Sequence, residues 1–178
     1  MLVTTVFIFI LTVLTITIHL EGLWVLRTLP KFFEDHPRMG VLAVVLTCLT
    51  LHVIEIALYA GGFGIADKFF GVGQFNDEKN LDALAYFYYA AITFTAVGYG
   101  DILPTGDIRL LAVAESLNGL LMIGWSGAYT FIAMQKLWSD RAEERRQARR
   151  ETRIKKRQGE ARVQPQRRPP RAPVDTKS

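Results

Sequence analysis

TAVGYGD at residues 95–101 is the stretch that decides the fold of this chain. It follows a short apolar and aromatic segment, residues 83–95, and precedes a long apolar run, residues 110–138. Gly98 and Gly100 alternate with larger side chains, and glycine adopts the positive φ that other residues resist. This alternation predicts a backbone that departs from ordinary strand geometry, with successive carbonyl groups turned the same way.

Three further features of length and hydropathy place this stretch in a membrane protein. Residues 2–20 contain no Asp, Glu, Lys or Arg, and residues 39–60 and 110–138 are similarly apolar. A bilayer needs about 20 apolar residues in a helix, so each of the three predicts a span. Residues 83–95 are too short to cross, which predicts a re-entrant helix followed by backbone that is surrounded by protein or water.

Charge is distributed unevenly along the 178 residues, which carry 21 Lys and Arg against 17 Asp and Glu. From Ser139 onward there are 14 basic and 6 acidic residues, so the tail is strongly basic and the rest is acidic. Cys48 is the only cysteine, which excludes an intrachain disulfide and a cysteine metal site. The apolar start lacks the charged residues and cleavage site of a secretory signal, so we expect it to be retained as a span.

Basic residues near the spans predict the orientation of the chain. Arg27, Lys31 and Arg38 lie between the first two spans, and Lys136 opens the basic tail. Because basic residues favour the cytoplasmic side, we expect a multi-pass protein of the cell membrane, with its N-terminus outside and its C-terminus in the cytoplasm.

YYAAITFTAVGYGD, residues 88–101, resembles the pore helix and selectivity filter of the potassium channel family. The plan of residues 39–138 resembles the simple two-span bacterial channels, with one additional span before it. The resemblance implies a homotetramer that conducts potassium ions passively, with no organic cofactor and no enzymatic activity. The alternative is a non-conducting membrane subunit or scaffold with a degenerate filter.

The predicted fold is an all-α membrane protein with three transmembrane helices, a re-entrant pore helix and a selectivity filter, assembled as a tetrameric pore. We expect the chain to divide into an N-terminal helix and cytoplasmic link (1–38), a pore domain (39–138) and a basic cytoplasmic tail, helical and then disordered (139–178). Within the pore domain we expect an outer helix at 39–60, a pore helix at 83–95, the filter at 96–101 and an inner helix at 109–138.

The resemblance also assigns roles to residues of the filter. In such channels, rings of backbone carbonyls replace the water shell of the ion. The implied potassium ligands are the carbonyls of Ala96, Val97, Gly98, Tyr99 and Gly100, and the implied supporting residues are Thr93, Thr95, Asp101, Tyr88 and Tyr89. The family usually has Thr where this chain has Ala96, so we expect a weaker innermost ion site. Tyr88 and Tyr89 either brace the filter or are ordinary interfacial or core aromatics.

Polar and glycine residues within the spans are candidates for gating. Gly119 is either a hinge of the inner helix or a position of close packing. Glu115 and Asn118 are three residues apart and either face the pore or bond to a neighbouring helix, and we favour the second for Glu115. His52 and Glu55 have the same spacing in the outer helix, where an interhelical polar contact is favoured over a pH sensor.

The basic tail has two interpretations. Residues 139–163 are rich in Arg, Glu, Gln and Ala, which predicts a solvated helix. Near an anionic leaflet each basic side chain contributes roughly 1 kcal/mol, so the tail either binds anionic lipids or acts as a plain topological anchor. A charge run alone does not indicate nucleic-acid binding.

Overall fold

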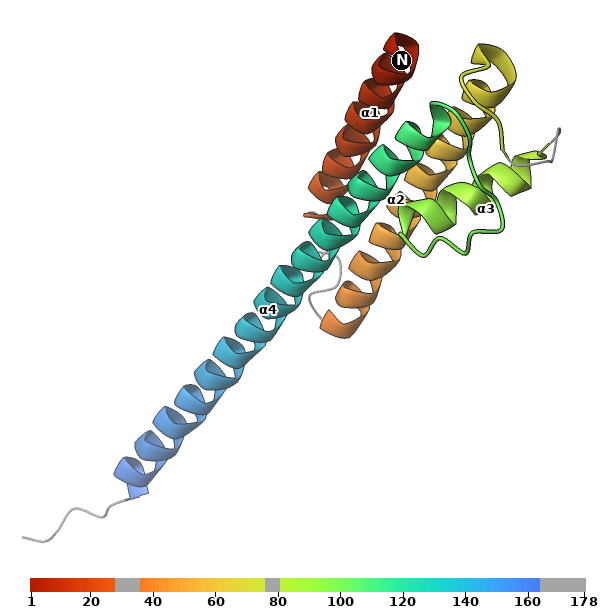
Figure 1. Cartoon of the computed structure of the whole chain (residues 1–178). Coiled ribbons are helices and arrows are strands. Elements are labelled where there is room, and N and C mark those ends of the chain that lie inside the picture. Colours follow the sequence, from red (N-terminus) through yellow and green to blue (C-terminus); the bar gives the residue numbers. More distant parts are fainter. Residues whose placement is uncertain (28–35, 76–80, 164–178) are drawn as a thin grey trace, which may run out of the picture. The chain divides into compact units, whose positions relative to one another are not determined.

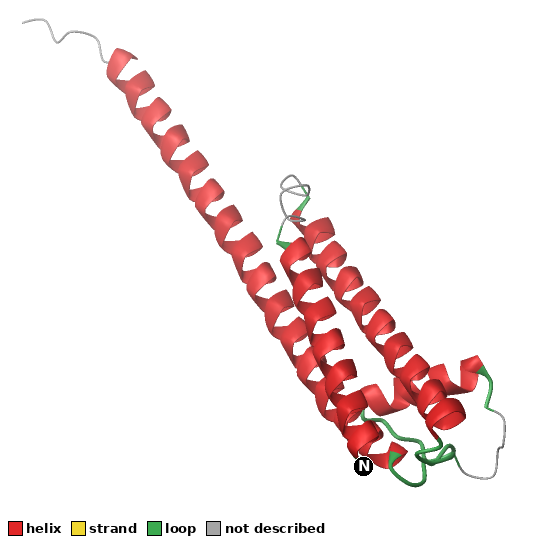
Figure 2. Ribbon diagram, turned by 90° about the horizontal axis from the view of Figure 1, so that it is seen from above, coloured by secondary structure: helices red, strands yellow, loops and turns green. Residues whose placement is uncertain are grey.

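The computed structural model describes residues 1–27, 36–75 and 81–163. It contains the helices α1 (Leu2–Leu26), α2 (Pro37–Ile65), α3 (Ala83–Phe94) and α4 (Ile108–Val163), with a π-helical turn η2 (Ala66–Phe70) after α2. The chain divides into two compact units, Met1–Gln135 and Lys136–Ser178. Figures 1 and 2 show only helices and loops among the described residues, apart from an isolated bridge between Phe75 and Pro104.

Three helices are long and apolar enough to cross a membrane, over Leu2–Leu26, Arg38–Phe70 and Ile108–Glu160. α3 is apolar but shorter than a span. The prediction of an all-α membrane protein is therefore confirmed. α2 extends five residues beyond the expected outer helix, α3 ends at Phe94, and the helical tail is part of α4, which is assigned as far as Val163.

The core of the first unit lies where α2 packs against α3 (Figure 1). Phe63 is fully buried and makes edge contacts with Phe75 and Tyr89, at centroid distances of 6.0 and 4.9 Å. Such aromatic pairs contribute about 0.5–1.5 kcal/mol beyond their burial. The hydroxyl of Tyr86 donates to Asp67 in η2, so the start of α3 is also attached to the end of α2. These contacts fix α3 in position for the residues that follow it.

α1 packs against α2. Two glycines permit a close approach: a Cβ on Gly22 would lie 2.4 Å from Leu51, and one on Gly62 would lie 2.6 Å from Leu11. Small residues of this kind allow membrane helices to come together. α1 also contacts α4, because Asn118 donates to Thr15 with an N to O distance of 2.7 Å.

Candidate functional site

A capped helix leads into the TAVGYGD stretch. Asp82 precedes α3 in extended conformation, and its carboxylate accepts a hydrogen bond of 2.7 Å from the backbone N–H of Ala85. This satisfies one of the free N–H groups at the start of the helix. At the other end Thr95 leaves the helix, and its hydroxyl donates to the carbonyl of Ala91. The helix therefore has a defined end immediately before Ala96.

The backbone after α3 alternates in conformation. Ala96, Gly98 and Gly100 have φ of 57°, 53° and 81°, whereas Val97 and Tyr99 between them do not have positive φ. The positive φ predicted for the two glycines is confirmed. Alternation in the sign of φ turns successive peptide groups toward one side of the chain. Ala96 is the only residue other than glycine with positive φ among the described residues, and this conformation costs an alanine about 1–2 kcal/mol.

The end of α3 determines the direction of these peptide groups. The N–H of Ala96 donates to Thr93, and those of Val97 and Gly98 both donate to Ile92, at 2.9, 2.9 and 3.1 Å. In a trans peptide the N–H and C=O groups point in opposite directions. The carbonyls that share a peptide with these three donors, from residue 95 to residue 97, therefore point away from the end of α3.

The side chains of the stretch are open in the single chain. Val97 is 54% exposed and Tyr99 is 72% exposed, and an added Cβ at Gly98 or Gly100 would meet no atom within 4 Å. Exposed apolar and aromatic side chains next to one another are typical of a surface that contacts another protein. Within the single chain, residues 96–98 are hydrogen-bonded to α3, whereas the side chains of Val97 and Tyr99 are exposed.

Tyr88 connects α3 to the end of the stretch. Its hydroxyl donates to the carboxylate of Asp101 over 2.7 Å, and the same carboxylate accepts from the N–H of Ile102. The hydrogen bond from Tyr88 lowers the pKa of Asp101 below its ordinary value, because it stabilises the charged form. Tyr88 therefore lies where a brace of the filter would lie.

Tyr89 has a different environment from its neighbour. It is buried and packs edge-on against Phe63 and Phe75, each at a centroid distance of 4.9 Å. It belongs to the aromatic core between α2 and α3. Tyr89 is thus a core aromatic, whereas a bracing role for Tyr88 stays a prediction that its contact with Asp101 supports.

α4 contacts the C-terminal end of α3 directly. A Cβ on Gly119 would lie 2.1 Å from the carbonyl oxygen of Phe94 and 2.9 Å from its ring. One turn earlier, the hydroxyl of Ser116 donates to the carbonyl of Thr93 over 3.0 Å. Close packing thus explains the glycine at 119, and a hinge at this position stays a prediction.

Asn118 and Glu115 are both buried within the chain. The amide of Asn118 donates to Thr15 of α1 and to the hydroxyl of Tyr59 of α2, at 2.7 and 3.2 Å. Its contacts are therefore interhelical. The carboxylate oxygens of Glu115 have no hydrogen-bond partner among the described residues of the chain, so the bond to a neighbouring helix favoured for this residue stays a prediction.

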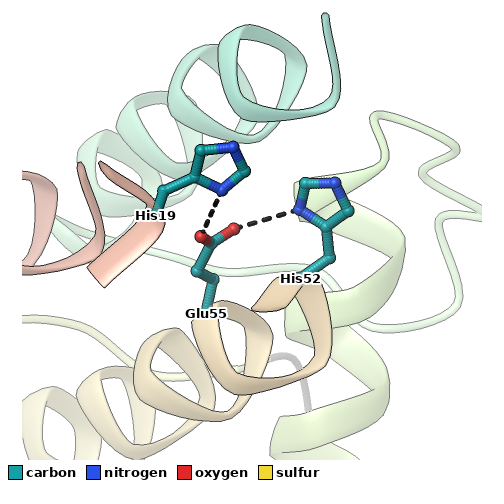
Figure 3. Close-up of side chains that lie close together, drawn as sticks. All are labelled: His19, His52 and Glu55. Atoms are coloured by element: carbon teal, nitrogen blue, oxygen red, sulfur yellow. Dashed lines mark hydrogen bonds and ion pairs between the residues drawn. The ribbon is translucent and has the colours of Figure 1, made fainter. Parts of the chain in front are cut away.

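A second polar cluster, formed by His19, His52 and Glu55, lies between α1 and α2 (Figure 3). The pairing of His52 with Glu55 follows from their spacing, and the structure shows it at 3.1 Å. His19 of α1, which the spacing of His52 and Glu55 does not indicate, is 2.8 Å from the other oxygen of Glu55. The available signal was the presence of two histidines and one carboxylate inside otherwise apolar spans.

Comparisons with known proteins agree with this geometry. The family model described as ion channel matches residues 41–136, which is more than half of the chain. The two-pore potassium channel 4 of Arabidopsis thaliana is 30% identical over 80 residues, covering 44% of this chain and 28% of that protein. The match thus spans less than a third of the length of this relative. No solved structure gives a significant match.

Proposed function

Because this chain belongs to the ion channel family, we propose that it is one subunit of a tetrameric channel that conducts potassium ions passively across a membrane. The proposed pore domain is residues 39–138, with the filter at 96–101. Movement of an ion down its gradient requires no catalytic residue and no organic cofactor.

The alternating backbone of residues 96–100 is the observation that carries this proposal. Positive φ at Ala96, Gly98 and Gly100 accompanies donation of the N–H groups of residues 96–98 to the end of α3, which turns the carbonyl oxygens of residues 95–97 away from the supporting helix. A dehydrated potassium ion needs several oxygens at once, and rings of backbone carbonyls supply them. The carbonyls of residues 96–100 are the proposed ligands.

The same geometry supports the proposed assembly of four chains. One chain lines only one side of an ion path, so the ion's remaining ligands must come from other copies. Val97 and Tyr99 are more than half exposed in the single chain and would be covered in such an assembly. Closed rotational symmetry is the usual arrangement of homo-oligomers, and a fourfold axis gives each ion site identical oxygens.

Two features of the proposed filter affect how it would bind potassium: the electrostatic field at the end of α3 and the alanine at position 96. The C-terminal end of α3, at Phe94, carries partial negative charge that favours cations near it. Ala96 contributes a carbonyl but no hydroxyl to the innermost site. We therefore propose weaker binding at that site, with the carbonyls of Val97, Gly98 and Tyr99 retaining potassium over sodium.

Placement in the cell membrane completes the proposal. The basic residues after the first and third spans favour a cytoplasmic location, which puts the N-terminus and α3 on the outer side. The basic tail, residues 139–178, is proposed to contact anionic lipids of the inner leaflet.

Flux of ions through the purified protein tests the proposal. The full chain would be reconstituted into liposomes, and uptake of potassium, rubidium and sodium compared, with the mass of the assembly measured in parallel. We expect a four-chain assembly that passes potassium and rubidium well and sodium poorly. A folded protein that passes none of these ions would instead support a non-conducting subunit or scaffold, and equal passage of sodium would exclude selectivity.

A further inference from the structure

Three ligand-bearing side chains meet inside the membrane part of this protein. Glu55 of α2 lies between His19 of α1 and His52 of its own helix, with O to N distances of 2.8 and 3.1 Å (Figure 3). One potential metal-ligating atom of each residue lies within 4.8 Å of those of the other two. No role in the proposed ion path uses these residues, because they lie on the two outer helices.

Burial distinguishes this cluster from ordinary surface polar groups. The side chains of His19 and Glu55 are fully buried, and that of His52 is 13% exposed. Ionisable residues inside a membrane are costly, and they are usually paired and functional. Aromatic rings surround the cluster: His19 lies 5.9 Å from Trp125 and His52 lies 5.7 Å from Phe94, between ring centroids.

We propose that His19, His52 and Glu55 bind a divalent transition metal ion, for which Zn²⁺ is the most suitable probe. Two imidazoles and one carboxylate are a common zinc ligand set, with a fourth position left for water. Hard cations such as Mg²⁺ and Ca²⁺ prefer oxygen ligands only, so they fit the cluster poorly.

The distances agree with this assignment. In a tetrahedral zinc site with bonds of about 2.0–2.1 Å, neighbouring ligand atoms lie about 3.3 Å apart. The two imidazole to carboxylate separations here are made to different oxygens of Glu55, each is within about half an ångström of that value, and the three ligand atoms lie within 4.8 Å of one another. Ligation through one carboxylate oxygen therefore requires the side chains to shift.

Metal binding at Nδ1 requires that the proton on that nitrogen move to Nε2 of the same imidazole. In the structure each Nδ1 faces a carboxylate oxygen, which suits an Nδ1–H that donates to Glu55. Binding of the metal at Nδ1 moves that proton to Nε2 of the same ring. For His19, Nε2 lies 3.3 Å from the hydroxyl of Ser126 on α4, which would accept the relocated N–H. A partner of this kind orients a metal-ligating histidine.

The competing explanation is a hydrogen-bonded triad in which the carboxylate simply accepts from two neutral imidazoles. The coordinates suit both, so retention of metal decides between them. The full-length protein would be purified with a tag free of histidine, loaded with Zn²⁺, and dialysed against a weak chelator. Metal content is then measured per chain, and Co²⁺ loading gives a visible absorption spectrum that reports tetrahedral ligation.

The chain supplies its own matched control, because it has three histidines and His36 lies exposed outside the cluster. We expect one retained Zn²⁺ per chain in the wild type and in His36→Gln. His19→Gln, His52→Gln and Glu55→Gln should lose it. Ser126→Ala, which removes only a positioning group, should bind about 10–100-fold more weakly. Excess Mg²⁺ should not displace the ion.

Several outcomes would overturn the assignment. A wild-type protein that retains no Zn²⁺ shows a hydrogen-bonded triad only. Equal binding by wild type and the cluster variants, or loss of binding in His36→Gln, places any metal elsewhere. His52→Gln alters the one partly exposed member and is the variant most compatible with folding, which circular dichroism would check. The readout is metal content, so it holds whether or not the protein conducts potassium.

Discussion

Replacement of Gly98 by alanine tests the backbone of the proposed filter directly. Gly98 has φ of 53°, and a Cβ there meets no atom within 4 Å, so alanine adds conformational cost without a clash in the chain. A left-handed residue with a Cβ costs about 1–2 kcal/mol, which is about 4–8 kcal/mol over four chains. Because each 1.4 kcal/mol is tenfold, the conducting backbone should be disfavoured by roughly a thousandfold or more.

The assay is rubidium uptake into liposomes that contain purified Gly98→Ala protein. Gly61→Ala is the matched control: Gly61 lies in α2, has no atom within 4 Å of an added Cβ and does not have positive φ. Alanine there should stabilise the helix by about 1 kcal/mol and leave uptake unchanged. We expect uptake to be lost in the first variant while the four-chain assembly is retained. Wild-type uptake by Gly98→Ala would refute the reasoning.

Three other substitutions have defined outcomes. Tyr88→Phe should raise the pKa of Asp101 toward its ordinary value, measured by carboxyl NMR titration. Because the pKa of Asp101 is lowered in the folded protein, this contact contributes fully to stability at pH values above the ordinary pKa of an aspartate. The contribution is lost as the pH falls through the pKa that Asp101 has in the folded protein. An unchanged titration of Asp101 in Tyr88→Phe would show that Tyr88 is not the cause of the lowered pKa. Ala96→Thr should tighten barium block by adding one hydroxyl per chain, despite a strained backbone, and unaltered block would count against an ion site there. Gly119→Ala should destabilise the protein by about 1–3 kcal/mol through the clash with Phe94, measured by thermal unfolding, whereas equal stability would contradict the close packing.

Much of the fold could be predicted because it depends on local sequence. The spans follow from long apolar runs with few ionisable residues, and α3 follows from a short apolar segment with Asp82 before it. The positive φ of Gly98 and Gly100 also follows from residue type, since glycine adopts it without steric cost.

The missed features depend on contacts between distant residues. The contact of His19 with Glu55 depends on how α1 is rotated against α2, which an apolar run with little periodicity does not determine. Likewise, the buried carboxylate of Glu115 without a partner depends on the placement of α4. At Ala96 the sequence indicates only a missing hydroxyl, because residue type gives no indication that an alanine adopts positive φ.

The contacts of α4 with the end of α3 have a mechanical consequence. Gly119 packs against the carbonyl of Phe94. The carbonyl of Thr93 accepts hydrogen bonds both from the hydroxyl of Ser116 and from the N–H of Ala96. Sliding or rotation of α4 at this level must therefore strain or break the bonds that set the first peptide group of the proposed filter. If residues 96–100 line the ion path, as proposed, the position of α4 and the shape of that path change together.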